Sequence, residues 1–147
     1  MSIRLTVVQP RFEEASVHAV PVFHERVRAG FPSPAEPYQH DFLDLNDLIV
    51  RDQSATFYVR VEGDSMEEAG IFDGDYLVVD RSIEPKAEHI VVAAVDGQLT
   101  VKKLRFENGN PRRPVLWPCN SRHAPIRLTQ DIDLHIWGVV TFALHPF

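Results

Sequence analysis

The stretch from residue 89 to residue 106 constrains the fold most strongly. Two runs of strand-forming residues, 89–95 (HIVVAAV) and 98–106 (QLTVKKLRF), flank the dipeptide Asp96-Gly97. A two-residue Asp-Gly connection between such runs is the strongest local signal for a β-hairpin. Other runs rich in β-branched and aromatic residues also predict strands, at 55–61, 76–80, 115–118 and 134–144, the last with a bend at Gly138. We therefore predict a mostly β fold.

One short helix is predicted at residues 43–50 (LDLNDLIV), where Leu45, Leu48 and Ile49 recur at helical spacing and Asp44 can act as the N-cap.

Residues 1–30 carry short alternating apolar groups separated by prolines, which favours an extended arm. Three prolines in residues 30–37 (GFPSPAEP) predict a semi-rigid connector, because proline restricts its own φ and the conformation of the residue before it.

The composition indicates one globular domain. The chain has 147 residues, of which 44% are apolar and 24% charged. Its formal net charge is −6, and its runs of basic residues are short. We therefore expect no direct, sequence-independent DNA binding. A single cysteine, Cys119, excludes an intrachain disulfide and a cysteine-based zinc site, and it favours a reducing, cytoplasmic location. No apolar run of about 18 residues is present, so no membrane span is expected.

Ser65 is the first candidate for chemistry. It lies in the sequence EGDSM, between the predicted strand 55–61 and a Gly/Asp-rich turn. A serine hydroxyl becomes a good nucleophile only when a neighbouring base takes its proton. None of the seven histidines lies in a recognisable triad context, and neither a G-x-S-x-G elbow nor an H-E-x-x-H metal motif is present. Lysine is the remaining choice of base.

The sequence TVKKL, residues 100–104, offers two lysines on one predicted strand. Side chains alternate along a strand, so Lys102 and Lys103 face opposite ways. Both faces carry apolar residues, and periodicity alone does not say which lysine points inward. A lysine base must be buried, because burial lowers its pKa from about 10.4 and leaves more of it neutral. A fall of about 3 units costs roughly 4 kcal/mol of stability at neutral pH.

Four blocks of the sequence, in this order and spacing, resemble the LexA/UmuD family of self-cleaving serine peptidases, and within it the UmuD-type proteins of SOS mutagenesis. The blocks are GFPSPA (30–35), LDLNDL (43–48), EGDSM with GIFDGDYLVVD (62–80), and VVAAVDGQLTVKKL (91–104). The resemblance covers roughly residues 22–144. It implies twisted antiparallel strands with one short helix, and three parts: an N-terminal arm (1–29) removed on self-cleavage, an extended connector (30–42) and a serine–lysine peptidase domain (43–147).

The resemblance also implies the site residues. Ser65 corresponds to the nucleophile and Lys102 to the general base, and the bond that is cleaved corresponds to Ala29–Gly30. The backbone N–H groups of Asp64 and Ser65 correspond to the oxyanion hole. No metal and no cofactor is implied. Some UmuD proteins have Cys-Gly at the cleaved bond, whereas this chain has Ala-Gly; both residues are small, so we still expect cleavage.

The function that the resemblance implies is self-cleavage stimulated by a RecA filament on single-stranded DNA. The shortened homodimer would then act as the accessory subunit of a UmuC-like Y-family translesion polymerase. Three alternatives remain: a non-catalytic dimeric binding module, a fragment of a LexA-like repressor, and a membrane signal peptidase. The arm of 29 residues is too short for a helix-turn-helix domain, so we do not expect a repressor. The lack of a membrane span argues against the signal peptidase.

Overall fold

The computed structural model describes residues 4–8, 18–23, 30, 40–128 and 131–147. Two compact units are present: β1 (Arg4–Val8) together with residues 52–147, and a smaller unit that contains β2, β3 and α1. Strands dominate the described residues, and one short α-helix accompanies them. The predicted mostly β fold is therefore confirmed.

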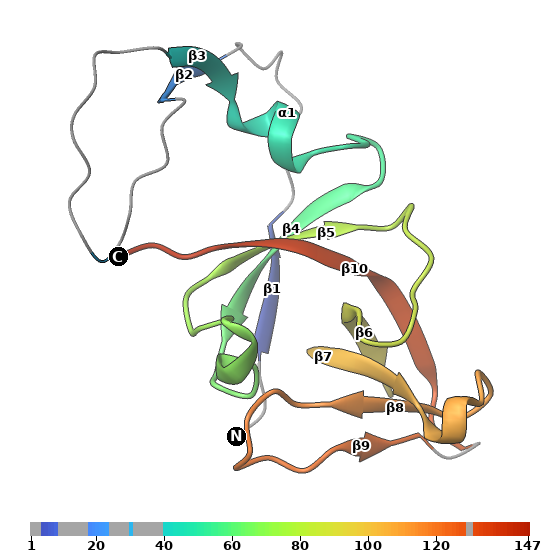
Figure 1. The fold of residues 1–147 in the computed structure, drawn as a ribbon. Coiled ribbons are helices and arrows are strands. Elements are labelled where there is room, and N and C mark those ends of the chain that lie inside the picture. The colour runs from blue at the N-terminus through green and yellow to red at the C-terminus, as the bar shows by residue number, and fades with distance from the viewer. Residues whose placement is uncertain (1–3, 9–17, 24–29, 31–39, 129–130) are drawn as a thin grey trace. The chain divides into compact units, whose positions relative to one another are not determined.

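The larger unit is built on one antiparallel sheet of eight strands, in the order β1-β4-β5-β10-β6-β7-β8-β9 (Figure 1). Two single-turn 3-10 helices, at Glu67–Ala69 and Glu107–Gly109, lie in the loops between its strands. The strands that follow β1 are β4 (Thr56–Glu62), β5 (Tyr76–Asp80), β6 (Ile90–Val95), β7 (Gln98–Phe106), β8 (Pro114–Trp117), β9 (Ile126–Arg127) and β10 (Leu134–Leu144).

The predicted hairpin is formed by β6 and β7, which pair antiparallel from Ile90↔Lys103 to Val95↔Gln98. Its turn residues Asp96 and Gly97 both have positive φ angles, of 47° and 78°. This is the backbone conformation that a tight two-residue turn needs and that Asp-Gly adopts readily. The local turn chemistry therefore sets the register of the strand that carries Lys102.

β10 joins the two halves of the sheet, because it pairs with β5 along one part of its length and with β6 along another (Figure 1). The register with β6 shifts between Ile136 and Gly138, at the predicted bend. A Cβ atom at Gly138 would lie 2.7 Å from Val79 Cγ1 and 2.9 Å from the carbonyl oxygen of Asp80. Glycine is thus required here by the close approach of β5.

β1 pairs antiparallel with β4, from Arg4↔Glu62 to Val8↔Tyr58. The sequence predicts only an extended arm for residues 1–30, so this strand pairing was not predicted. Short alternation of apolar residues indicates extended chain, but it does not identify the strand that the chain will pair with.

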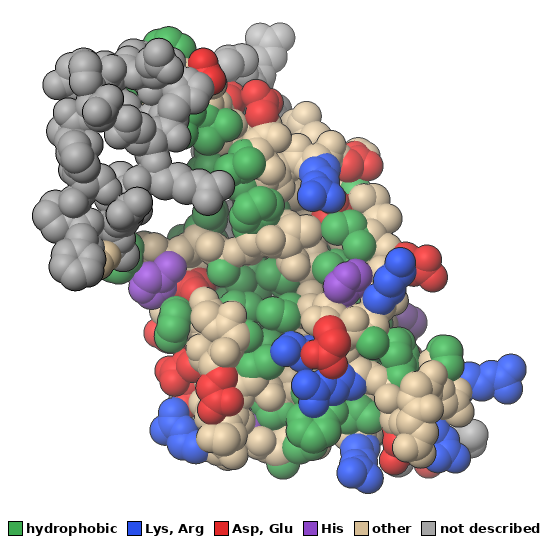
Figure 2. Space-filling model, viewed as in Figure 1, with side chains coloured by type: hydrophobic (Ala, Val, Ile, Leu, Met, Phe, Trp, Pro, Cys, Tyr) green, Lys and Arg blue, Asp and Glu red, His purple; other side chains and the backbone are tan. Residues whose placement is uncertain are grey.

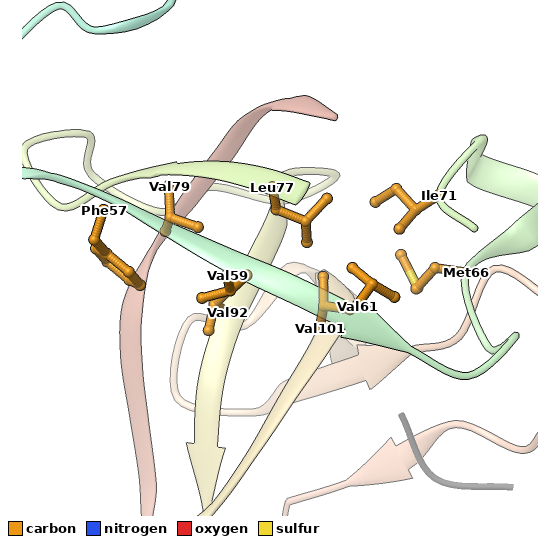
Figure 3. Packing of buried hydrophobic residues seen from close by; sticks show 9 residues of the cluster. All are labelled: Phe57, Val59, Val61, Met66, Ile71, Leu77, Val79, Val92 and Val101. Carbon is orange, nitrogen blue, oxygen red and sulfur yellow. The ribbon is translucent and has the colours of Figure 1, made fainter. Parts of the chain in front are cut away.

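The hydrophobic core of the larger unit has two clusters of buried residues. The first draws on β4, β5, β6 and β7 and on the loop after β4, and its nine members are Phe57, Val59, Val61, Met66, Ile71, Leu77, Val79, Val92 and Val101 (Figure 3). The second consists of Val91, Ala93, Leu104, Leu116 and Val139. β6 and β7 contribute to both clusters, so the strand that bears Lys102 is surrounded by apolar side chains.

The smaller unit pairs β2 (Ala19–Phe23) with β3 (His40–Asp44) and continues into α1 (Leu45–Ile49). The Asp44 side chain accepts a hydrogen bond from the N–H of Asn46 at 2.9 Å, so the predicted N-cap is confirmed. Residues 31–39 of the predicted connector lie outside the described residues. Within the described part of the chain, no helix is long and apolar enough to cross a membrane.

Candidate active site

Ser65 lies in the loop between β4 and β5, and its residue surface is only 2% exposed. Gly63 enters this loop with φ 109°, which glycine adopts without steric cost, and its N–H donates to Asp73 Oδ1 at 2.8 Å. Met66, the next residue after Ser65, is fully buried in the first core cluster (Figure 3). The backbone is therefore anchored on both sides of the serine hydroxyl.

Lys102 extends from β7 and brings its amine to this hydroxyl. Its Nζ lies 3.0 Å from Ser65 Oγ, within hydrogen-bond distance. The same amine also donates to Thr100 Oγ1 at 3.0 Å and to the carbonyl oxygen of Val101 at 3.1 Å. The Lys102 residue is 6% exposed. The structure thus brings together the two residues that the resemblance implied as nucleophile and base.

Burial lowers the pKa of Lys102 from 10.5 to about 8, because desolvation disfavours the charged amine; the neighbouring Cys119 acts in the opposite direction. At pH 7 an amine with this pKa is neutral in about one molecule in ten, compared with about one in three thousand for an ordinary lysine. The fraction of the lysine that is neutral at pH 7 is therefore about 300 times larger than for an ordinary lysine. A lysine in this position can accept the serine proton near neutral pH.

Lys103 takes the other face of β7, as strand alternation requires. Its Nζ lies 3.6 Å from Glu88 Oε2, and Glu88 also accepts a hydrogen bond from Arg105 Nε at 2.9 Å. The hydrogen bond from Arg105 is the main reason that the pKa of Glu88 is lowered. The structure thus decides which lysine points inward, which the strand pattern left open. Lys102 faces the serine, and Lys103 belongs to a partly exposed cluster of charged side chains.

Among the residues that the structure describes, the partner of the Ser65 hydroxyl is not a histidine. In the described part of the chain, the hydrogen-bond partner of the Ser65 hydroxyl is Lys102. His123 and His145 bond to the carboxylates of Asp64 and Asp75 instead. No group of three or more His, Cys, Asp or Glu side chains that could hold a metal ion occurs among the described residues.

A second loop, residues 118–125 between β8 and β9, holds the serine loop at Asp64. His123 Nε2 lies 2.9 Å from Asp64 Oδ1, and Arg122 Nη2 donates to Asp64 Oδ2 at 3.2 Å. The hydrogen bond with His123 is the largest cause of the lowered pKa of Asp64. The buried Asn120 side chain donates from Nδ2 to the main-chain oxygen of Asp64 at 2.8 Å.

The same loop makes main-chain contacts with the serine loop. The N–H of Glu68 donates to the carbonyl oxygen of Cys119 at 2.7 Å, and the N–H of Cys119 lies 3.4 Å from Met66 Sδ. Cys119 is partly buried against the first core cluster, as a small apolar residue would be. Sequence reasoning missed the role of this loop, because residues such as Asn120 after a strand are typical of any turn.

The remaining predicted residues lie elsewhere in the chain. Ala29 is outside the described residues. Gly30 is exposed and belongs to the smaller unit, whereas Ser65 and Lys102 belong to the larger one. The N–H groups of Asp64 and Ser65, predicted as the oxyanion hole, lie on the loop that presents the hydroxyl.

Comparison with known proteins gives one consistent result. The model of the family described as "Peptidase S24-like" matches residues 21–141. Protein MucA of Salmonella typhimurium is 44% identical over 133 residues, which cover 88% of each chain. Protein SamA of Salmonella typhimurium strain LT2 is 41% identical, over 96% of this chain and 95% of its own. LexA repressor 2 of Xanthomonas axonopodis pv. citri is 37% identical, over 82% of this chain and 55% of its own.

Proposed function

Since this chain belongs to the peptidase S24-like family, as its resemblance to the LexA/UmuD proteins predicted, we propose that it is a serine–lysine peptidase that cleaves its own Ala29–Gly30 bond. The observation that carries the proposal is the 3.0 Å contact between Ser65 Oγ and Lys102 Nζ, an amine with a lowered pKa. A solvated lysine at that distance would be almost entirely charged at pH 7 and could not act as a base.

The reaction begins when the neutral amine of Lys102 takes the proton of the Ser65 hydroxyl, and Oγ attacks the carbonyl carbon of Ala29. The N–H groups of Asp64 and Ser65 donate to the oxygen that becomes negative. The Lys102 ammonium then protonates the departing amine of Gly30, which leaves residues 1–29 as an ester on Ser65. Water, deprotonated by Lys102, hydrolyses this ester and regenerates the free hydroxyl.

The cleaved bond suits a site of this kind. Ala29 carries a single methyl group and Gly30 carries no side chain, so neither residue obstructs the approach of the serine loop. Gly30 is exposed, and a Cβ added there would meet no atom within 4 Å. Gly30 itself is therefore accessible, and we propose that a peptidase site of the same chain or of a second copy reaches the bond from this side.

The proposed biological role is that of the UmuD-type proteins in SOS mutagenesis. A RecA filament on single-stranded DNA would stimulate cleavage, and the shortened homodimer, residues 30–147, would serve a UmuC-like Y-family polymerase. The relatives MucA and SamA, which match this chain over most of their length, support the assignment. Direct DNA binding is not part of the role, in keeping with the net charge of −6 and with the interleaved acidic and basic side chains on the face in Figure 2.

The test is self-cleavage of the purified protein at about pH 10, where the Lys102 amine is neutral. We expect slow conversion to one shorter species whose N-terminus is Gly30. Ser65→Ala and Lys102→Ala should abolish the conversion, and Lys103→Ala should retain it. Equal fragmentation of the Ser65→Ala protein would show that a contaminating protease is responsible. Loss of cleavage in Lys103→Ala alone would show that Lys103, and not Lys102, is the base.

Cleavage within one chain and cleavage between chains are separated by a mixing experiment. One protein carries Ser65→Ala and retains its cleavable bond. The other retains Ser65 and carries Ala29→Asp, which makes the bond a poor fit. A product from the first protein, in the presence of the second, requires cleavage between chains.

A further inference from the structure

The peptide bond between Asp64 and Ser65 is held from one side by Asn120. Its Nδ2 atom donates to the main-chain oxygen of Asp64 at 2.8 Å, and its residue surface is only 5% exposed. We infer that Asn120 is a positioning residue for self-cleavage: by holding the carbonyl of Asp64, it aims the N–H of Ser65 at the place where the oxyanion forms. This inference rests on the proposed function, because the N–H of Ser65 is an oxyanion donor only if the chain cleaves a peptide bond.

The planarity of the peptide bond makes this action direct. The carbonyl oxygen of Asp64 and the N–H of Ser65 belong to the same peptide unit, and in a trans peptide they point in opposite directions. Fixing the oxygen therefore fixes the direction of the N–H. A hydrogen bond accepted by the carbonyl also polarises the N–H and makes it a better donor. The main-chain N–H of Glu67 donates to the same oxygen over a longer distance, 3.2 Å.

The orientation of the Asn120 amide follows from its other contact. The main-chain N–H of Arg122 lies 3.0 Å from Asn120 Oδ1, and an N–H group requires an acceptor. The oxygen of the amide therefore faces Arg122, and the nitrogen faces Asp64. Asn120 combines a turn-stabilising acceptor with a buried donor, and only the donor reaches the serine loop.

The loop that carries Asn120 is itself fixed against the serine loop. The hydrogen bond from Glu68 N–H to the Cys119 carbonyl joins the two backbones directly before Asn120, and Arg122 and His123, two and three residues after it, hold the Asp64 carboxylate. A donor held in this way needs little reorganisation when charge develops on the substrate oxygen, which is the condition under which such donors contribute most.

Asn120→Asp is the sharpest test, because aspartate keeps the oxygen that accepts from Arg122 and replaces the donor to Asp64 by a second acceptor. Asn110→Asp is the matched control: exposed Asn110 also accepts from the N–H two residues later, that of Arg112, at 3.0 Å, and the charge change is the same. Asn120→Ala removes the donor without adding charge. Self-cleavage rate constants are measured from about pH 6 to about pH 11, and cooperative thermal unfolding checks that each variant is folded.

We expect the rate constant on the high-pH plateau to fall between about tenfold and about a hundredfold in both Asn120 variants and to stay unchanged in Asn110→Asp. The midpoint of the pH profile should stay near that of the unsubstituted protein in Asn120→Ala, because the lysine remains buried. If Asn120→Ala does not fold, the plateau rate constant of Asn120→Asp, which keeps the acceptor for the N–H of Arg122, decides whether the inference holds.

A plateau within about twofold of the unsubstituted protein in a folded Asn120 variant would overturn the inference. So would a midpoint in Asn120→Ala that moves toward 10.5, because Asn120 would then act through the burial of the lysine. Failure of the unsubstituted protein to cleave at any pH would instead refute the proposed function itself.

Discussion

Replacement of Lys102 by methionine tests the physical basis of the site, because methionine has a similar shape and cannot take up a proton. The lysine pKa is about 8 in the folded protein and 10.5 in the reference state. Between these values the unfolded chain binds a proton that the folded chain does not, so stability rises with pH in this window. The cost of burying the lysine is fully present below about pH 8 and disappears above about pH 10.5.

The magnitude follows from the two pKa values. At about 1.36 kcal/mol per unit, the full cost of burying the charged lysine is about 3 kcal/mol. Between pH 7 and pH 10 the lysine should add about 2–3 kcal/mol to the free energy of unfolding, and methionine should add nothing. The difference in the free energy of unfolding between the two proteins should therefore change by about 2–3 kcal/mol over this range, which corresponds to about 5–10 °C in Tm for a chain of this size.

Urea unfolding of both proteins at pH 7 and pH 10 measures this change. Both proteins carry Ala29→Asp, so that self-cleavage does not interfere during equilibration. Other titrating groups are common to the two proteins and cancel in the comparison. A difference that stays constant within about 0.5 kcal/mol would mean that Lys102 is solvated, and the assignment of a neutral lysine base would fail.

The remaining predictions concern the pH profile and the bend in β10. The self-cleavage rate should rise with pH to a midpoint near 8, with about a tenth of the plateau rate at pH 7; a midpoint near 10.5 in a time course followed on gels would contradict the buried amine. Gly138→Ala should lower the free energy of unfolding by about 1–3 kcal/mol, because its Cβ would lie 2.7 Å from Val79 Cγ1 and 2.9 Å from the Asp80 oxygen. Gly30→Ala, which meets no atom within 4 Å, is the control and should leave urea unfolding unchanged.

Much of the fold could be predicted because its signals are local. The Asp96-Gly97 turn, the Asp44 cap and the bend at Gly138 each depend on a few neighbouring residues, and the structure shows all three. The pairing of β1 with β4 could not be predicted in the same way, because it joins segments far apart in the sequence. Pairing depends on which sheet edge is free, and no short pattern encodes that.

In the candidate site, too, the residues with local signals could be predicted and those that depend on long-range contacts could not. Strand alternation showed that only one of Lys102 and Lys103 could point inward, and family resemblance selected Lys102, which the structure places beside Ser65. Asn120 and His123 escaped notice because their contacts with the serine loop arise only when the loop after β8 folds against the loop after β4. Residues of these types occur in ordinary turns, so the sequence offered no reason to single them out.

Burial of the lysine links the stability of this chain to its proposed chemistry. Lys102 is only 6% exposed, and the desolvation that lowers its pKa makes the charged amine costly and the neutral amine available. A histidine base would carry little of this cost, because its ordinary pKa already lies near 6.5. A lysine base requires a rigid, dry support, and β7 provides one, held by β6 on one side and by β8 on the other. Substitutions that let water reach position 102 should therefore stabilise the charged amine and slow self-cleavage together, even where Ser65 and Lys102 are untouched.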